Sequence, residues 1–328
     1  MTNEPSRDRA LPAERGVLEA RPELGGARST PAFGLPDGAP SGLPADLGTT
    51  RIGSRTFAWG TRTFVMGILN VTPDSFSGDG LLQAREPSAA AVDLATGMAA
   101  AGADLLDVGG ESSRPGHRAV TVEDELARVI PVIRAVRAAL PDTPISIDTT
   151  KPAVAEAALD AGADLVNDVW GVSEDDALAR LAGERGAPIA LMHNRAEARY
   201  TTLLAEVVAD LQRAIERALR AGVAWDSIIV DPGFGFGKTA EHNLALLREL
   251  GSLAILGRPI LLGASRKSTL GRVLDLPADQ RLEATLATTA IAIASGVDVI
   301  RVHDVRENVR AARMADAIVR GARVGEDA

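Results

Sequence analysis

The stretch Phe64–Val71, FVMGILNV, shows the pattern from which the fold can be predicted. It is almost continuously apolar, and a polar residue, Asn70, stands near its end. A strand that is buried on both faces of a parallel sheet has this composition. Similar runs follow at fairly even spacing: DLLDVGG (104–110), ISIDT (145–149), DLVNDV (164–169), IALMH (189–193), IIVDPG (228–233), ILLGAS (260–265) and VIRVHDV (299–305). Together they predict eight buried strands.

Helical stretches separate these runs. Pro87–Ala101 ends at Gly102 and Pro152–Ala161 ends at Gly162, and a glycine in this position is typical of a helix C-terminus. Parallel strands need crossover connections, which helices usually supply. The alternation therefore predicts the α/β class, and eight repeats predict a (β/α)8 TIM barrel over residues 64–321.

The two ends of the chain lie outside this repeat. Residues 1–50 are rich in Pro, Gly, Ala and Arg and show no sustained periodicity, so we predict a disordered N-terminal extension. A tail that binds a partner is the alternative. Residues 51–63 carry strand-forming residues on both sides of Gly60, which predicts an N-terminal β-hairpin that could cap the bottom of the barrel. Residues 322–328 are assigned to a C-terminal tail.

The composition of the 328 residues excludes several classes of protein. A net charge of −9 argues against a nucleic-acid partner. The chain has no cysteine, which excludes disulfides, thiolate nucleophiles and cysteine-ligated zinc. No run approaches the ~18 apolar residues of a membrane span, and the first residues lack the apolar segment of a secretory signal. We expect a cytoplasmic protein with small-molecule partners and no membrane partner.

Polar residues recur at or near the ends of the predicted strands. They are Asn70, Asp107, Asp148, Asn167, His193, Asp231 and Arg301. In a TIM barrel the carboxyl ends of all strands meet at one rim, which holds the active site. The pattern therefore predicts an enzyme. The alternative for Asp148, Asn167 and Asp231 is that they cap helix N-termini, and for Asn70 that its amide braces its own loop. For the basic residues the alternative is a solvated surface charge.

Six segments, in order, resemble the dihydropteroate synthase family of folate synthesis. They are MGILNVTPDSFSGDG (66–80), DLLDVGGESSRPG (104–116), ISIDTTKPAVAEAALDAGADLVNDV (145–169), DPGFGFGKT (231–239), GASRKS (263–268) and VIRVHDV (299–305). The resemblance covers essentially residues 52–321. It implies a transferase that condenses 6-hydroxymethyl-7,8-dihydropterin diphosphate with p-aminobenzoate, giving dihydropteroate and pyrophosphate. Family members are usually homodimers that pack through the last barrel helices.

The resemblance also assigns roles to single residues. It implies a catalytic set of Asp148, Lys267, Arg301 and His303. The implied binding set for the pterin diphosphate is Ser113, Asp148, Asn167, Asp231, Lys267, Arg301, Val302 and His303. The chemistry fits these roles, because a pterin edge needs buried donors and acceptors, and the loops after strands seven and eight of a barrel often hold phosphate.

Two further sites follow from the same resemblance. The p-aminobenzoate pocket would be lined by Phe76, Ser113, Arg114, Pro115 and Ser268. The cofactor would be Mg²⁺, with Asn70 as its single protein ligand. A hard cation that keeps its waters and uses substrate phosphate suits so sparse a site. The implied mechanism needs no covalent nucleophile.

Some signals are weaker or misleading. The motif GFGFGKT (233–239) looks like a nucleotide-binding loop, but Pro232 stands where a P-loop needs glycine. We expect Phe236 and Lys238 to lie near the pterin. His193 could line the site or bond to a neighbour, and these two interpretations remain open. The other histidines outside the strand ends, His117 and His242, are predicted to be surface residues.

Departures from the family pattern are small. Ser113 stands where threonine is usual, the first loop reads SFSGDG for SFSDGG, and MHNR (192–195) replaces the usual Met-His-Met stretch. None removes a group that the reaction needs. Two alternatives to the synthase remain, a non-catalytic pterin-binding paralogue and a folate-dependent methyltransferase domain. A methyltransferase has no diphosphate to hold, so the TPDSF, SRPG and SRKS segments argue against it.

Overall fold

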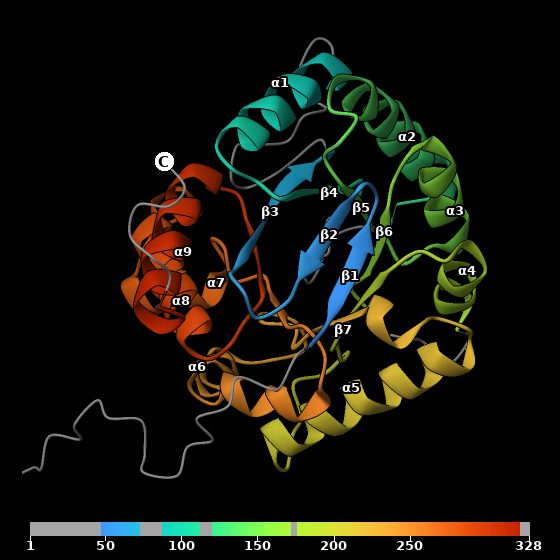
Figure 1. Cartoon of the computed structure of the whole chain (residues 1–328). Helices are drawn as coiled ribbons and strands as arrows, with labels where there is room; N and C mark the ends of the chain where they lie inside the picture. Colours follow the sequence, from blue (N-terminus) through green and yellow to red (C-terminus); the bar gives the residue numbers. More distant parts are fainter. Residues whose placement is uncertain (1–46, 73–86, 112–119, 172–175, 322–328) are drawn as a thin grey trace, which may run out of the picture. The chain divides into compact units, whose positions relative to one another are not determined.

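The computed structural model describes residues 47–72, 87–111, 120–171 and 176–321, and within them the barrel is plain (Figure 1). Its strands are β3 Phe64–Asn70, β4 Leu105–Gly109, β5 Ile145–Asp148, β6 Leu165–Asp168, β7 Ile189–Met192, β8 Ile228–Asp231, β9 Leu261–Leu262 and β10 Val299–Val302. They form one parallel sheet in the order β8-β7-β6-β5-β4-β3-β10-β9. A single parallel bridge, Val230 to Ile260, joins the two edge strands and nearly closes the ring. The predicted TIM barrel is confirmed.

Helices connect the strands and surround them (Figure 1). They are α1 Pro87–Ala100, α2 Val122–Ala139, α3 Pro152–Ala161, α4 Ala177–Arg185, α5 Leu203–Arg220, α6 Ala240–Arg248, α7 Ser268–Leu274, α8 Leu282–Ala294 and α9 Val305–Val319. Short 3-10 helices lie at η2 Trp225–Ser227, η3 Leu250–Leu256 and η4 Ala278–Gln280. The predicted stop at Gly162 is confirmed, because this residue has a left-handed φ of 110° and donates to the carbonyl groups that end α3.

The N-terminal hairpin is present, but its predicted position was wrong. Its strands are β1 Thr49–Ile52 and β2 Arg55–Ala58, so the chain turns at Gly53 and Ser54 and not at Gly60. A two-residue hairpin turn needs a positive φ, and Gly53 supplies 59°. Gly60 lies in the connection to β3, where its N–H donates to Asp298 Oδ1 at 3.1 Å. The rest of the predicted extension, residues 1–46, and the tail 322–328 lie outside the described residues.

The apolar core has two parts. The larger part fills the space between the outer face of the sheet and the helices. The smaller part lies inside the barrel and joins the hairpin to the first residues of the strands; it contains Ile52, Phe57, Trp59, Phe64, Met66, Leu105, Leu165, Ala190, Ile229, Leu261 and Val299. The hairpin therefore closes the N-terminal end of the barrel, as predicted. The carboxyl end of the barrel is left for polar side chains.

Candidate active site

The register of the sheet brings the predicted polar residues together. Asn70 pairs with Gly109, Gly109 pairs with Asp148, and Asp148 pairs with Asn167. Register partners on neighbouring strands share a face, so this row of side chains points into the carboxyl end of the barrel. Asp148 and Asn167 are buried, and Asn70 is half-buried.

Arg301 reaches across this end of the barrel from β10. Its Nε donates to Asp107 Oδ2 at 2.6 Å, and its Nη2 donates to Asp148 Oδ2 at 2.8 Å. Asn167 Nδ2 donates to the same Asp107 oxygen at 3.2 Å. Three strands are thus linked to β10 through one guanidinium group. A buried guanidinium with two carboxylates is a charge-assisted arrangement that holds each partner in one orientation.

Burial and charge shift the pKa values of this group. Burial raises the pKa of Asp148 to about 7, although the guanidinium of Arg301 opposes the shift. Burial works to lower the pKa of Arg301, but the carboxylates of Asp107 and Asp148 outweigh it and raise this pKa above the usual range. Perturbed groups of this kind in a concave polar site are typical of enzymes.

Lys267 lies opposite, directly before α7. Burial lowers the pKa of Lys267 to about 7, while Asp231 opposes and Arg301 reinforces the shift. The ammonium lies 4.2 Å from the ring centroid of Phe236 and donates to the carbonyl of Phe234. A Cβ on Gly263 would lie 3.8 Å from the Arg301 side chain and 4.0 Å from Lys267 Nζ, so both cations lie next to this glycine.

Asp231 ends β8 on the same side. It is buried, and burial raises its pKa while the ammonium of Lys267 opposes the shift. Its Oδ1 accepts from the backbone N–H of Gly233 at 2.7 Å, which leaves the carboxylate aimed by its own loop. The acidic and amide groups therefore lie at the same end of the barrel as the two cations.

The last two strand ends are also tied together. Ser265 Oγ accepts from the backbone N–H of His303 at 3.2 Å and lies 3.0 Å from its Nδ1. Arg266 forms two hydrogen bonds with Asp304, of 3.0 and 2.5 Å. These contacts place Lys267 and His303 on neighbouring loops at one part of the rim.

Comparison with known proteins identifies the family to which this chain belongs. The family of pterin binding enzymes matches residues 66–303. A dihydropteroate synthase of Clostridium beijerinckii is 49% identical over 271 residues, which cover 82% of this chain and 99% of that protein. This chain belongs to the dihydropteroate synthase family. The prediction made from its motifs is confirmed, and the chain is an enzyme of the transferase class.

Solved dihydropteroate synthases share the fold. One from Clostridium difficile, crystallised in the presence of pteroic acid, has a TM-score of 0.77 and 49% identity and covers 80% of this chain and 99% of its own. One from Thermus thermophilus has a TM-score of 0.72 and 40% identity and covers 83% of this chain and 100% of its own; it has been solved in complex with 6HMPPP and in complex with 4-aminobenzoate.

Not every residue that the family resemblance implied lies in the described pocket. Phe76, Ser113, Arg114 and Pro115 lie outside the described residues. Ser268 is exposed at the start of α7, beside Lys267. The side chain of Val302 packs in the outer core, so this residue faces the pocket only through its backbone.

Sequence analysis placed Asp107 among the polar strand ends but gave it no role of its own, whereas in the structure it binds two of the predicted site residues. The residue is fully buried, and it binds both Arg301 and Asn167 through one oxygen. A signal was present in the run DLLDVGG, because Asp107 stands two residues before Gly109 and therefore shares its inward face. What the sequence could not show is the partner, which is 194 residues away.

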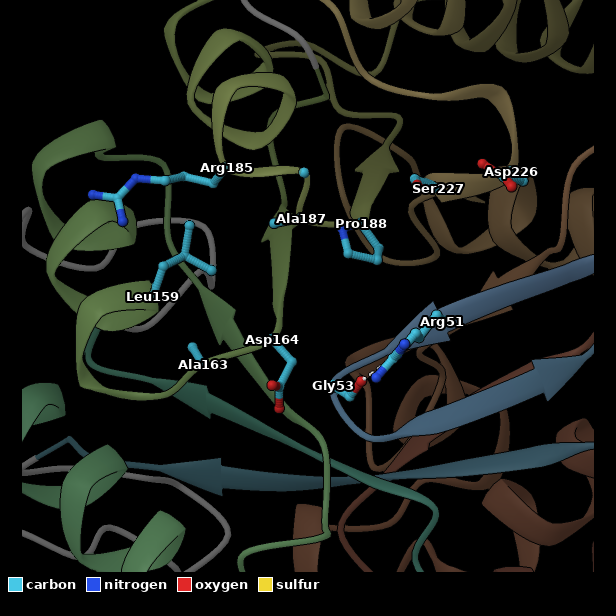
Figure 2. Close-up of a pocket in the computed structure, with 11 residues that line it drawn as sticks. Arg51, Gly53, Leu159, Ala163, Asp164, Arg185, Ala187, Pro188, Asp226 and Ser227 are labelled. Carbon is cyan, nitrogen blue, oxygen red and sulfur yellow. Dashed lines mark hydrogen bonds between the residues drawn. The ribbon is translucent and has the colours of Figure 1, made fainter.

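A hollow of about 470 Å³ lies at the other end of the barrel (Figure 2). It is lined by Arg51, Gly53, Leu159, Ala163, Asp164, Arg185, Gly186, Ala187, Pro188, Asp226 and Ser227. Two of its four charged residues are engaged by groups that do not line it, since Asp164 binds Arg137 and Arg185 binds Asp160 at 2.6 Å. Polar groups therefore do not converge on this hollow as they do at the carboxyl rim.

No helix among residues 47–321 that the structure describes is both long and apolar enough to cross a lipid bilayer.

Proposed function

We propose that the pocket at the carboxyl end of this barrel joins 6-hydroxymethyl-7,8-dihydropterin diphosphate to p-aminobenzoate, releasing pyrophosphate. The single observation that carries the assignment is the convergence of Asp148, Asn167 and Asp231 with Lys267 and Arg301 at one end of the barrel. Dihydropteroate synthases solved with 6HMPPP, 4-aminobenzoate and pteroic acid support it. The same relatives favour the synthase over a methyltransferase and over a non-catalytic paralogue.

The acidic and amide groups bind the pterin edge in this proposal. Asp148 and Asp231 accept hydrogen bonds from ring N–H and amine groups, and Asn167 offers both a donor and an acceptor. All three are buried. A ligand that left them unpaired would lose about 1–3 kcal/mol for each group, which is the physical basis of selectivity for the heterocycle.

The cations handle the leaving group. The bond between the pterin methylene carbon and the diphosphate oxygen breaks, and its electron pair leaves with pyrophosphate. Lys267, Arg301 and His303 neutralise the charge that develops on that anion, while Asp148 stabilises the positive charge on the pterin. The amine nitrogen of p-aminobenzoate then forms the new C–N bond and gives up a proton. Electrostatic stabilisation and positioning supply the catalysis, and no covalent nucleophile takes part.

The second substrate binds beside the anion site. Ser268, exposed next to Lys267, is the described member of the proposed p-aminobenzoate pocket. The remaining members, Phe76, Ser113, Arg114 and Pro115, belong to the two segments outside the described residues. They remain predictions from the family resemblance.

Asn70 fits a role as the protein ligand of Mg²⁺. It offers an amide oxygen, a hard donor, at the half-buried end of β3. Among the described residues no cluster of three or more His, Asp or Glu side chains could hold a metal. A cation held here would depend on Asn70, water and the substrate diphosphate. When bound it would neutralise diphosphate charge and so assist the departure of pyrophosphate.

We also propose a homodimer that packs through the last barrel helices. Large apolar side chains are exposed on these helices: Val273 and Leu274 on α7, Ile291 on α8, and Met314, Ile318 and Val319 on α9. Exposed apolar groups of this size often mark an interface between subunits. Sedimentation velocity would test it, and a monomer at micromolar concentration would contradict it. The cytoplasmic location stays a prediction.

The reaction is tested by a pyrophosphate-release assay with and without p-aminobenzoate over a titration of Mg²⁺. We expect release that requires both p-aminobenzoate and Mg²⁺. Asn70→Ala should shift the Mg²⁺ requirement to higher concentration without abolishing binding of pteroic acid. Protein that binds the pterin diphosphate but releases no pyrophosphate would be a non-catalytic paralogue and would overturn the proposal.

A further inference from the structure

His193, Asp210 and Lys238 form a partly buried polar cluster beside Asp231, and none of these three side chains is assigned to the substrate. His193 follows β7, and its backbone N–H donates to the carbonyl of Asp231 at 2.8 Å. The residue is only 3% exposed. Its Nε2 lies 3.1 Å from Asp210 Oδ2, and its Nδ1 lies 2.8 Å from Lys238 Nζ. The imidazole thus bridges helix α5 and the loop after β8.

The partners determine how His193 is protonated. Burial lowers the pKa of Lys238 to about 7. Its protonated form has only donors, so Nδ1 accepts from that form. The proton of a neutral ring is then on Nε2, which donates to the carboxylate of Asp210. Burial and, second to it, the charge of Lys238 lower the pKa of His193 to about 4 against the opposing charge of Asp210, so the ring stays neutral at neutral pH.

Asp210 is itself held firmly. Its Oδ2 accepts from Arg195 Nε at 2.9 Å and from Arg195 Nη2 at 2.7 Å. Its other oxygen accepts from Arg213. Because Asp210 belongs to the long helix α5, it gives His193 a fixed point on the scaffold.

Lys238 binds backbone carbonyl groups of its own loop, the one that follows β8. Besides His193, its ammonium donates to the carbonyl of Gly233 at 3.0 Å and to the carbonyl of Phe236 at 3.1 Å. The three N–H donors of the ammonium therefore have three acceptors, His193 Nδ1 and the two carbonyl oxygens. Close packing also fits the loop to the neighbouring one, since a Cβ on Gly233 would lie 1.8 Å from the carbonyl oxygen of His193.

This loop carries the substrate groups. Gly233 N–H holds Asp231 Oδ1, the carbonyl of Phe234 accepts from Lys267, and the Phe236 ring lies 4.2 Å from the Lys267 ammonium. A shift of the loop would move the Asp231 carboxylate and the Lys267 ammonium together.

We propose that His193 and Asp210 form a positioning pair, which holds Lys238 and thereby sets the loop after β8 for binding of the pterin diphosphate. The inference rests on the proposed function. It settles the two interpretations of His193 in favour of a positioning role, because both ring nitrogens are engaged by Asp210 and Lys238.

Two substitutions at His193 separate its bond to Lys238 from its bond to Asp210. Asparagine can place an acceptor near the position of Nδ1 and so retain the bond to Lys238, whereas glutamine can place a donor near Nε2 and retain only Asp210. We expect His193→Gln and Lys238→Met to raise KM for the pterin diphosphate about tenfold, the effect of a buried polar group left unpaired. His193→Asn should restore most of the affinity. KM for p-aminobenzoate and kcat should change little in all three.

The control is Arg185→Met, which removes a basic side chain at the opposite end of the barrel, where Arg185 binds Asp160 and Glu156. It should leave both KM values unchanged. Thermal unfolding shows whether each variant folds, and Lys238→Met tests the same link if His193→Gln does not fold. ¹⁵N NMR of histidine-labelled protein should show one buried ring that stays neutral, with its proton on Nε2.

The outcomes are distinct. Unchanged KM for the pterin diphosphate in both His193→Gln and Lys238→Met would overturn the proposal, as would a parallel rise in both KM values together with lower thermal stability, which a merely structural role would give. If the wild-type protein releases no pyrophosphate, the proposed function fails. Calorimetric binding of pteroic acid to the same variants would still decide whether the pair positions the loop.

Discussion

The two ends of the barrel interior are built from the same strands but have opposite chemistry. At the N-terminal end the strands contribute Met66, Leu105, Leu165, Ala190, Ile229, Leu261 and Val299, which pack against the hairpin. Two residues further along β4, β6 and β8 the same inner face carries Asp107, Asn167 and Asp231. A strand repeats its orientation every second residue, so one short step changes an apolar layer into a polar one.

The difference shows where stability and function reside. The apolar layer buries aromatic rings, and Phe57 lies 5.6 Å from Trp59 and 4.8 Å from Phe64 between ring centroids. The polar layer contains buried atoms, Asp107 Oδ1 and Ser146 Oγ, that have no hydrogen-bond partner among the described residues. Such groups cost free energy of folding. We therefore expect the carboxyl end to bind substrate and to lower the stability of the fold. The apolar N-terminal end supplies stability that offsets this loss.

The largest expected effect is on stability, at the apolar end. Phe57→Ala should lower the free energy of unfolding by about 3–5 kcal/mol, because it opens a cavity in a packed aromatic cluster. Phe57 is 2% exposed. Urea unfolding measures the change, and kcat/KM of the folded protein should stay close to that of the wild type.

The matched exchange at the polar end is Phe236→Ala, on the half-buried ring beneath Lys267. It should barely change the free energy of unfolding but should raise KM for the pterin diphosphate. If Phe57→Ala impaired catalysis as strongly as Phe236→Ala, the division of stability and function between the two ends would be contradicted.

The next effect is on catalysis. Lys267→Ala should lower kcat/KM for pyrophosphate release by about 10²–10³-fold, as expected when one preorganised charge is removed from a transition state. Arg185→Ala is the control, since this arginine lies at the opposite end and binds Asp160 and Glu156 on the surface. Equal activity of Lys267→Ala and the wild type would remove Lys267 from the mechanism.

A smaller effect is expected at the hairpin turn. Gly53→Ala should cost about 1–2 kcal/mol, because a side chain disfavours the left-handed backbone. The φ of Gly53 is 59°, and a Cβ would lie 2.7 Å from Asp164 Oδ1. Gly97→Ala in α1, where a Cβ meets nothing within 4 Å, should instead stabilise by about 0.5–1 kcal/mol. Melting temperatures of the two variants that moved in the same direction would contradict this prediction.

The smallest effect near neutral pH concerns Lys267. Burial lowers its pKa to about 7, so the charged form is complete below that pH and is lost as the pH rises through it. Asp148, whose pKa burial raises to about 7, must be ionised to stabilise the pterin cation, so kcat/KM should fall below that pH. On the alkaline side, loss of the Lys267 charge should lower kcat/KM about tenfold for each pH unit. Lys267→Arg should lack this step, since arginine keeps its charge. A pH profile that is the same in both proteins would assign the step to another group.

Much of this architecture could be predicted from the amino-acid sequence. Asp148, Asn167 and Asp231 end apolar runs, and parallel strands bring such ends to one rim. The predicted hairpin turn falls too late in the chain, at Gly60 and not Gly53, because both glycines are flanked by strand-forming residues and both have a positive φ. Only packing against the bottom layer of the barrel selects between them.

Contacts across the barrel could not be read in the same way. The bond between Arg301 and Asp107 joins residues 194 positions apart, and that between Lys238 and His193 joins residues 45 positions apart. Each depends on the closure of the sheet, which neither local composition nor spacing contains. For the same reason the sequence left the role of His193 open.

Apolar periodicity and the polar residue after each run were enough to establish eight strands, one active rim and, through motif resemblance, the dihydropteroate synthase family. These are local properties, because a strand's burial and the direction of its last side chain follow from its own residues. The pairing of charges was decided by the closed barrel alone. Burial is what raises the pKa of Asp148 and lowers that of Lys267, and burial exists only once distant segments have packed around them.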